Sequence, residues 1–217
     1  MNRRVIISFV IMLTGLFLTC PAQESIKDLE AQVQRSPRDI PTLMKLGIQY
    51  HHQGVAGDEN AVEKGFACFD TILAIEPTNA MALAYRGSLW TMRGRDASEP
   101  MTKMNDVDNG IDEMDKAVEL APENVTVRIT RGVNSLHLPP MFKRLGTALK
   151  DFTYLLAHPG FSKFDISLQS NIYCWAGIAY KQDNQRDKAK ELLQKAILVA
   201  PQSESAHTAE QELKGLS

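Results

Sequence analysis

The sequence feature that most constrains the fold is the stretch 171–201, which has the pattern of two amphipathic helices joined by a polar turn. In its first half, aromatic and small residues recur at spacings of three, one and three, which places them on one stripe of a helix. That stripe consists of Tyr173, Ala176, Gly177 and Tyr180. Small residues let two helices approach closely, so the pattern predicts a tightly packed helical hairpin.

The second half of the stretch repeats this arrangement on a shorter helix. Asp183 and Asn184 are residues that favour the intervening turn. Apolar residues then recur at helical spacing, charged residues occupy the opposite face, and Pro201 stops the helix. The apolar positions are Ala189, Leu193, Ala196 and Ile197.

Three further units with the same order of residues precede this stretch. Each first helix carries a small residue on its apolar stripe, at Gly47, Gly87 and Gly132. Each unit ends in an apolar tail closed by proline, and the four tails read Ile-Leu-Ala-Ile-Glu-Pro, Ala-Val-Glu-Leu-Ala-Pro, Leu-Leu-Ala-His-Pro and Ala-Ile-Leu-Val-Ala-Pro. The sequence therefore predicts four successive helical hairpins between about residues 40 and 201.

These units resemble the tetratricopeptide repeat (TPR), a helix-turn-helix unit of about 34 residues, with Tyr173 at its aromatic place and Leu193 at its phenylalanine place. The resemblance implies an all-α, TPR-like α-solenoid of about four helix-turn-helix units with flanking N- and C-terminal helices. It also implies a concave surface, lined by the first helices, that binds peptides. The predicted division is a signal peptide at 1–22, an N-terminal helix at 23–36 and a repeat domain with a C-terminal capping helix at 37–217.

The first unit is longer than the last one. The spacing from Gly47 to Pro77 is six residues longer than the equivalent spacing from Gly177 to Pro201. We expect this insertion in the turn or at the start of the second helix. The first helix of the unit is expected to end at Gly54, because glycine favours a helix stop.

The second unit has a surplus of eleven residues over the last one. Its first helix is expected to end at Arg93 and Gly94, followed by a polar linker at 95–100 and a long helix at 101–120. The surplus is enough for about three extra turns of helix or for a turn with a protruding loop. In the third unit, two prolines in the segment 137–142 prevent the first helix from continuing.

The N-terminus has the order of a secretory signal. Arg3 and Arg4 precede an apolar run at 5–18, and small residues follow it at Cys20 and Ala22. The run is shorter than the roughly 20 apolar residues that span a bilayer, which favours a cleaved signal over a permanent anchor. Two routes stay open: cleavage after Ala22, or cleavage before Cys20 with lipidation of its thiol. The sequence thus predicts an exported protein, periplasmic or secreted, that contacts a membrane only if Cys20 is lipidated or the signal is uncleaved.

The composition argues against several functional classes. The net charge is −2, and no cluster of lysine and arginine indicates a nucleic-acid partner.

We find no nucleophile with a base at a known spacing, no glycine-rich phosphate loop and no metal-ligand spacing, so we expect no catalytic residues, no cofactor and no metal. His51 and His52 are adjacent, and their side chains diverge by about 100 degrees on a helix, so the two cannot both face one metal ion. Cys68 and Cys174 lie in apolar patterns of different units and are expected to be buried and unbridged.

Two arginines stand directly before packing glycines. At these places, Arg86 and Arg131 would be partly buried, and a buried guanidinium needs a carboxylate nearby. We interpret them as structural ion pairs between units, with binding of a ligand as the alternative. The candidate carboxylates are Asp70, Asp112, Asp115 and Asp151.

The resemblance assigns a set of residues to the concave surface and to partner binding. They are Met44, Ile48 and His52 in the first unit, Ala84, Ser88 and Met92 in the second, and Ile129, Val133 and His137 in the third. This surface is apolar rather than basic. Three interpretations stay open: a groove for an apolar or helical peptide, a groove filled by the first or last helix of the chain itself, and an incorrect repeat frame.

The expected function is that of a non-enzymatic interaction scaffold or adaptor of the cell envelope or periplasm, which binds a protein or peptide. The first alternative is an accessory subunit of an envelope assembly that contacts its partner through the convex face or the insertion at 95–109. The second is an enzyme that uses His137 or the arginines with a small ligand.

Overall fold

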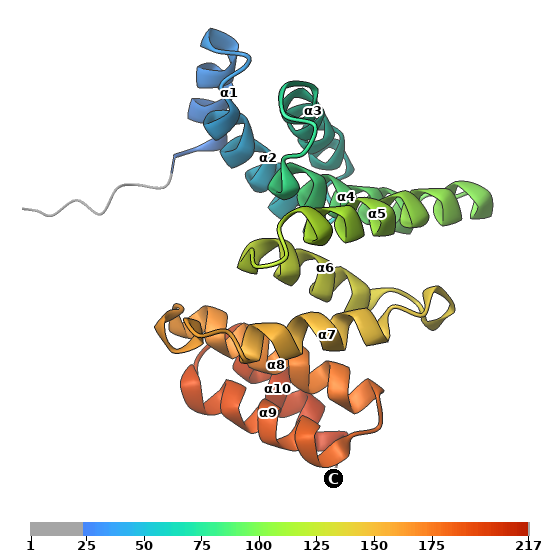
Figure 1. The fold of residues 1–217 in the computed structure, drawn as a ribbon, viewed down its shortest axis with the longest axis vertical. Coiled ribbons are helices and arrows are strands. Elements are labelled where there is room, and N and C mark those ends of the chain that lie inside the picture. The colour runs from blue at the N-terminus through green and yellow to red at the C-terminus, as the bar shows by residue number, and fades with distance from the viewer. Residues whose placement is uncertain (1–23, 217) are drawn as a thin grey trace, which may run out of the picture.

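The computed structural model describes residues 24–216, so the signal sequence predicted at 1–22 lies outside the described residues. Within that range the chain consists of ten α-helices, two short 3-10 segments and the links between them, without strands. Figure 1 shows the helices as an elongated stack that runs from α1 at one end to α9 and α10 at the other. This arrangement confirms the predicted all-α solenoid.

The helices alternate between first and second members of the four units. The first helices are α2 (Ile40–Val55), α4 (Ala80–Asp96), α6 (Val125–His137) and α8 (Ile166–Gln182). Their partners are α3 (Glu59–Ile75), α5 (Pro100–Leu120), α7 (Leu145–Leu156) and α9 (Arg186–Val199). The flanking helices are α1 (Ile26–Arg35) and α10 (Glu204–Lys214), and the 3-10 segments are η1 (Pro140–Phe142) and η2 (Phe161–Lys163).

Polar side chains fix where several helices begin. The side chains of Ser25, Asp39, Asn79 and Asn124 each accept a hydrogen bond from the backbone N–H three residues later. Such a bond satisfies one of the free donors at a helix start and contributes about 1 kcal/mol. The order of these capping residues in the sequence therefore sets the register of the units.

The surplus in the first unit lengthens its helices and leaves its turn unchanged. The turn at 56–58 has the same length as the turn at 183–185 in the last unit. Gly47 lies eight residues before the end of α2, whereas Gly177 lies five residues before the end of α8, and the remaining surplus lies at the start of α3. Helix α2 ends at Val55, one residue after the expected end at Gly54.

The surplus in the second unit is also helical, and the polar linker predicted at 95–100 is shorter in the structure. Helix α4 continues to Asp96, and only 97–99 separate it from α5. A Cβ atom at Gly94 would lie 2.9 Å from Cγ2 of Val107 and 3.0 Å from the carbonyl oxygen of Lys103. This glycine therefore permits close contact between α4 and α5 instead of ending the helix. We call the resulting part of the α4–α5 pair, residues 94–107, the hairpin extension.

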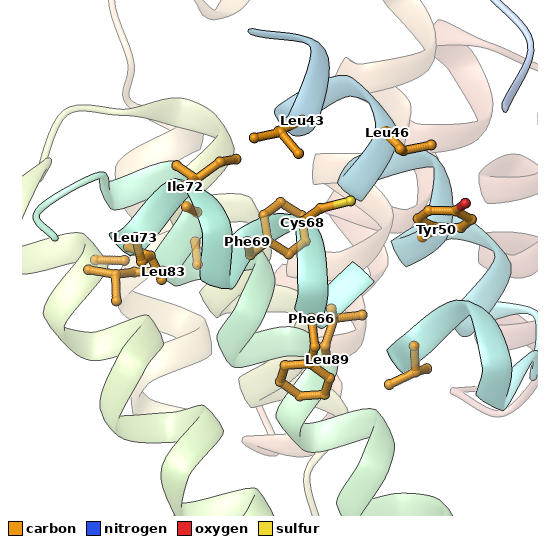
Figure 2. Packing of buried hydrophobic residues seen from close by; sticks show 14 of the residues in the cluster. Leu43, Leu46, Tyr50, Phe66, Cys68, Phe69, Ile72, Leu73, Leu83 and Leu89 are labelled. Atoms are coloured by element: carbon orange, nitrogen blue, oxygen red, sulfur yellow. The ribbon is translucent and has the colours of Figure 1, made fainter. Parts of the chain in front are cut away.

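The buried apolar side chains form two clusters. The first joins α1 to α5 and includes Val127 of α6, and the second runs from Leu136 to Leu216. Figure 2 shows side chains of the first cluster, where Phe69 and Ile72 of α3 lie among leucines of α2 and α4. Both described cysteines are free and buried, as predicted.

The terminal helices cover the two ends of the stack. Apolar side chains of α1, including Leu29, pack into the first cluster beside α2. Helix α10 packs on α8 and α9 through Ala209. None of the described helices is long and apolar enough to cross a membrane.

Candidate functional site

A cavity of about 750 Å³ opens on the side of the stack formed by the first helices. Its walls come from the C-terminal parts of α2 and α4, from one side of α6 along its whole length, from the hairpin extension, and from the segment 138–142 that follows α6. Trp175 of α8 contributes to the lining as well. The cavity thus spans the first three units and reaches the fourth.

Six of the residues predicted for partner binding line this cavity. They are His52, Ser88, Met92, Ile129, Val133 and His137. The structure places Met44, Ile48 and Ala84 outside the lining, where Ala84 is buried in the first apolar cluster and the other two pack against it. Met44 and Ile48 lie nearer the start of α2 than its lining residues, and Ala84 is only 1% exposed although Tyr85 beside it lines the cavity.

A set of hydrogen-bonded polar side chains joins α2, α4 and α6 at the cavity. His51 Nε2 lies 2.8 Å from Ser88 Oγ. Asn134 Nδ2 donates to Ser88 Oγ at 3.1 Å, and Thr91 Oγ1 lies 2.7 Å from Asn134 Oδ1. We call these four residues the polar ladder. Asn134 was not predicted from the sequence, although an amide side chain between Val133 and Ser135 on a packed helix is a signal for such a role.

The contact between His51 and Ser88 resembles a base beside a nucleophile, but its surroundings do not suit catalysis. Ser88 is only 1% exposed, so a substrate has no access to its hydroxyl group. Burial lowers the pKa of His51 to about 4, which makes the imidazole a weak base near neutral pH. His51 Nδ1 has no hydrogen-bond partner among the described residues, whereas a catalytic base is normally oriented by a third group. The polar ladder therefore holds three first helices together.

Two basic residues lie at the edge of the cavity, on a surface that the sequence predicted to be apolar rather than basic. Arg95 and Lys103, both on the hairpin extension, line the cavity, and none of its lining residues is Asp or Glu. Arg95 pairs with Asp96 at 2.7 Å, and Lys103 Nζ donates to the carbonyl oxygen of Arg95 at 3.1 Å. Sequence analysis assigned both basic residues to a linker or helix start and did not place them beside the first helices.

The two arginines predicted to form ion pairs do so away from the cavity. Arg86 of α4 contacts Asp70 at 2.6 Å and Glu113 at 2.7 Å. Glu113 was not among the predicted carboxylates, and its neighbour Asp112 has no such contact with Arg86. The pair thus links the second helices α3 and α5 through α4.

Arg131 belongs to a larger network between the second and third units. It contacts Asp151 of α7 at 2.8 Å and Asp115 of α5 at 3.1 Å. Asp151 also binds Arg128 at 2.8 Å, and Asp115 also binds Arg144 at 2.6 Å. Because each guanidinium already faces a carboxylate, this network favours stacking of units over binding of an anion.

No terminal helix of the described chain fills the cavity. Its lining contains residues of neither α1 nor α10, which pack on α2 and on α8 and α9 respectively. The interpretation of a groove filled by the first or last described helix is therefore wrong.

Comparison with known proteins agrees with this architecture. The family model for the tetratricopeptide repeat matches residues 170–203, and no curated protein sequence matches the chain. A thermophilic TPR protein of Thermus thermophilus is similar in structure, with 15% identity, a TM-score of 0.68, and coverage of 87% of this chain and 88% of that chain. The crystal structure of MamA is also similar, with 18% identity, a TM-score of 0.50, and coverage of 87% and 89%. These likenesses concern the fold alone. The chain therefore contains a tetratricopeptide repeat at 170–203, within a helical stack whose fold is similar to that of solved TPR proteins.

Proposed function

We propose that the protein is a non-enzymatic interaction scaffold that binds a peptide, or a segment of a partner protein, in the concave cavity. The observation that carries this proposal is the open cavity of about 750 Å³ between three first helices, which no other described part of the chain covers. The exposed large apolar residues Val55, in the lining, and Met141, in the adjoining turn, support it. Exposed apolar surface around a concavity is typical of a binding site.

The alternative contact through the insertion at 95–109 leads to the same surface. Arg95, Lys103 and Val107 of the hairpin extension form one wall of the cavity. A partner that binds this insertion from the inner side would therefore also meet the first helices.

The test is a selection of binding peptides from a random library displayed on phage, followed by affinity measurements on purified variants. Val133→Glu places a carboxylate in the cavity and is expected to weaken binding of selected peptides at least about tenfold. His137→Glu repeats the test at an exposed position of the same lining, where folding is least disturbed.

The matched control is Leu198→Glu on α9, where the native side chain is 80% exposed and outside the cavity. We expect this variant to bind the selected peptides like the unmodified protein. If all the variants bind the selected peptides equally, and thermal melting shows that each is folded, the cavity is not the peptide-binding site.

We also propose that the protein acts after export, in the periplasm or outside the cell. The support is the signal-like order of Arg3, Arg4, the apolar run at 5–18 and the small residues Cys20 and Ala22. Intact mass of the protein from membrane and soluble fractions tests this proposal. A mass beginning at Gln23 or a lipidated Cys20 is expected, and an unprocessed N-terminus in the soluble cytoplasmic fraction would refute it.

A further inference from the structure

We infer, building on the proposed function, that the cavity selects an acidic partner segment in which a large apolar side chain enters the cavity and adjacent carboxylates meet Lys103 at its edge. The first reason is the distribution of charge. The whole chain has more acidic than basic residues, 26 against 24, yet the cavity lining has no Asp or Glu. The lack of carboxylates is therefore a local property of this surface.

Lys103 carries the positive charge that remains available at the edge. Its side chain is exposed, and no carboxylate of the described residues lies within ion-pair distance of its ammonium, although, after the hydrogen bond from Arg95, its charge helps to lower the pKa of Asp96. Arg95 is already bound to Asp96 through Nε and Nη2, so these three residues together keep one positive charge. A partner carboxylate beside Lys103 would neutralise this charge.

The neighbouring hollow has the opposite character. A smaller cavity of about 390 Å³ lies between α3 and the α4–α5 pair, and its lining includes Glu59, Glu63, Asp96 and Asp106 with Arg93 as the basic residue. The α4–α5 pair therefore separates an acidic hollow from a carboxylate-free cavity. Long-range electrostatics would steer an acidic segment away from the first and toward the second.

The interior of the cavity suits an apolar anchor. Met92, Val107, Ile129, Phe142 and Trp175 reach it from five different elements. A volume of about 750 Å³ lies within the roughly 300–1,000 Å³ usual for ligand pockets, which is ample for an aromatic or leucine side chain. Such side chains are the usual energetic centre of an interface.

The hydrogen-bonding groups of Asn134 in the polar ladder are already occupied, so they do not bind a partner's charged group. Asn134 Nδ2 uses its two protons on Ser88 Oγ and the carbonyl oxygen of Thr130. Its Oδ1 is within hydrogen-bond distance of Thr91. The amide of Asn134 thus has no spare donor for a partner carboxylate, and Lys103 at the edge is where we expect that carboxylate to bind.

The experiment compares the composition of peptides that the full protein and its variants select from the same random phage library. We expect Asp and Glu to be enriched beside aromatic or aliphatic residues, and Lys103→Glu to abolish or reverse that enrichment. The matched control is Lys116→Glu, an equal charge change at another exposed lysine of α5 outside the lining. It should select like the unmodified protein.

Affinity of one selected acidic peptide gives the second readout. We expect Lys103→Glu to weaken it about fivefold in about 50 mM salt, with the difference lost in about 0.5 M salt, because rim charges are screened. Equal enrichment of Asp and Glu by Lys103→Glu would overturn the inference. Selected peptides without acidic residues that still depend on Val133 would overturn it and leave the proposed function standing, whereas binding that ignores both residues would refute both.

Discussion

Asp151 is a fully buried carboxylate, 0% exposed, and two nearly buried guanidinium groups depend on it. Asp151→Ala would leave Arg128 and Arg131 with a large part of their charge unpaired inside the protein. Removing one partner of a buried ion pair typically costs about 3–5 kcal/mol of the free energy of unfolding. We expect a loss of that size, measured by urea denaturation followed by circular dichroism.

The matched control removes a carboxylate from an exposed arginine pair. Asp70 is 57% exposed in its side chain, and Arg86 keeps Glu113 when Asp70 is removed. Asp70→Ala should therefore lower the free energy of unfolding by less than about 1 kcal/mol. Similar losses in the two variants would show that burial does not decide the strength of these pairs.

Single residues differ in how far the sequence could predict their roles. Ion pairs of Arg86 and Arg131 were predictable, because a long cation before a packing glycine must meet a carboxylate. The contact of Arg144 with Asp115 was not, since it depends on the path of the segment 138–142 between α6 and α7. Asn134 was missed for a similar reason, because its partners lie on α4, forty or more residues away.

At the level of elements, the α4–α5 pair depends on glycines that let two backbones touch. A Cβ atom at Gly110 would lie 2.5 Å from the carbonyl oxygen of Gly87 and 2.7 Å from Cγ2 of Thr91. Gly110→Ala must therefore push α5 away from α4. We expect a net loss of about 1–3 kcal/mol in the free energy of unfolding, despite the better helix propensity of alanine.

Gly146 provides the comparison for this substitution. It lies in the first turn of α7, and a Cβ atom there meets nothing within 4 Å. Gly146→Ala should raise the free energy of unfolding by about 0.5–1 kcal/mol, because alanine favours the helix without a clash. Thermal melting of both variants gives the comparison, and destabilisation by Gly146→Ala would contradict this account.

Two other glycines, Gly54 and Gly94, lie one and two residues before the ends of their helices, α2 and α4. Gly54 and Gly94 were interpreted as stops, because glycine is common just after a helix. Each follows the packing glycine of its unit by seven residues, which is about two turns, so it lies on the same face of the helix. That spacing is the signal in the sequence that could have predicted close packing at these two glycines, besides their place near the helix ends.

At the scale of the whole molecule, the stack has two apolar clusters that meet at α6. Val127 belongs to the first and Leu136 to the second, while the charged network around Asp151 joins α5, α6 and α7. In a repeat protein each unit contacts mainly its neighbours, so stability can differ along the stack. The sequence predicted the order of the units but not this division, which depends on where charged residues replace apolar ones between α5 and α7.

The division predicts that the two halves respond separately to core mutations. The two tryptophans of the chain report on them, because Trp90 packs against the first cluster and Trp175 against the second. Leu193→Ala should remove about 2–5 kcal/mol from the second cluster, and Ile72→Ala a similar amount from the first. In proteins that keep one tryptophan, through Trp175→Phe or Trp90→Phe, urea unfolding is followed by fluorescence. We expect Leu193→Ala to lower the midpoint of the Trp175 transition more than that of Trp90, and Ile72→Ala to do the reverse. Transitions that coincide for both tryptophans in every variant would mean that the described helices unfold as one cooperative unit.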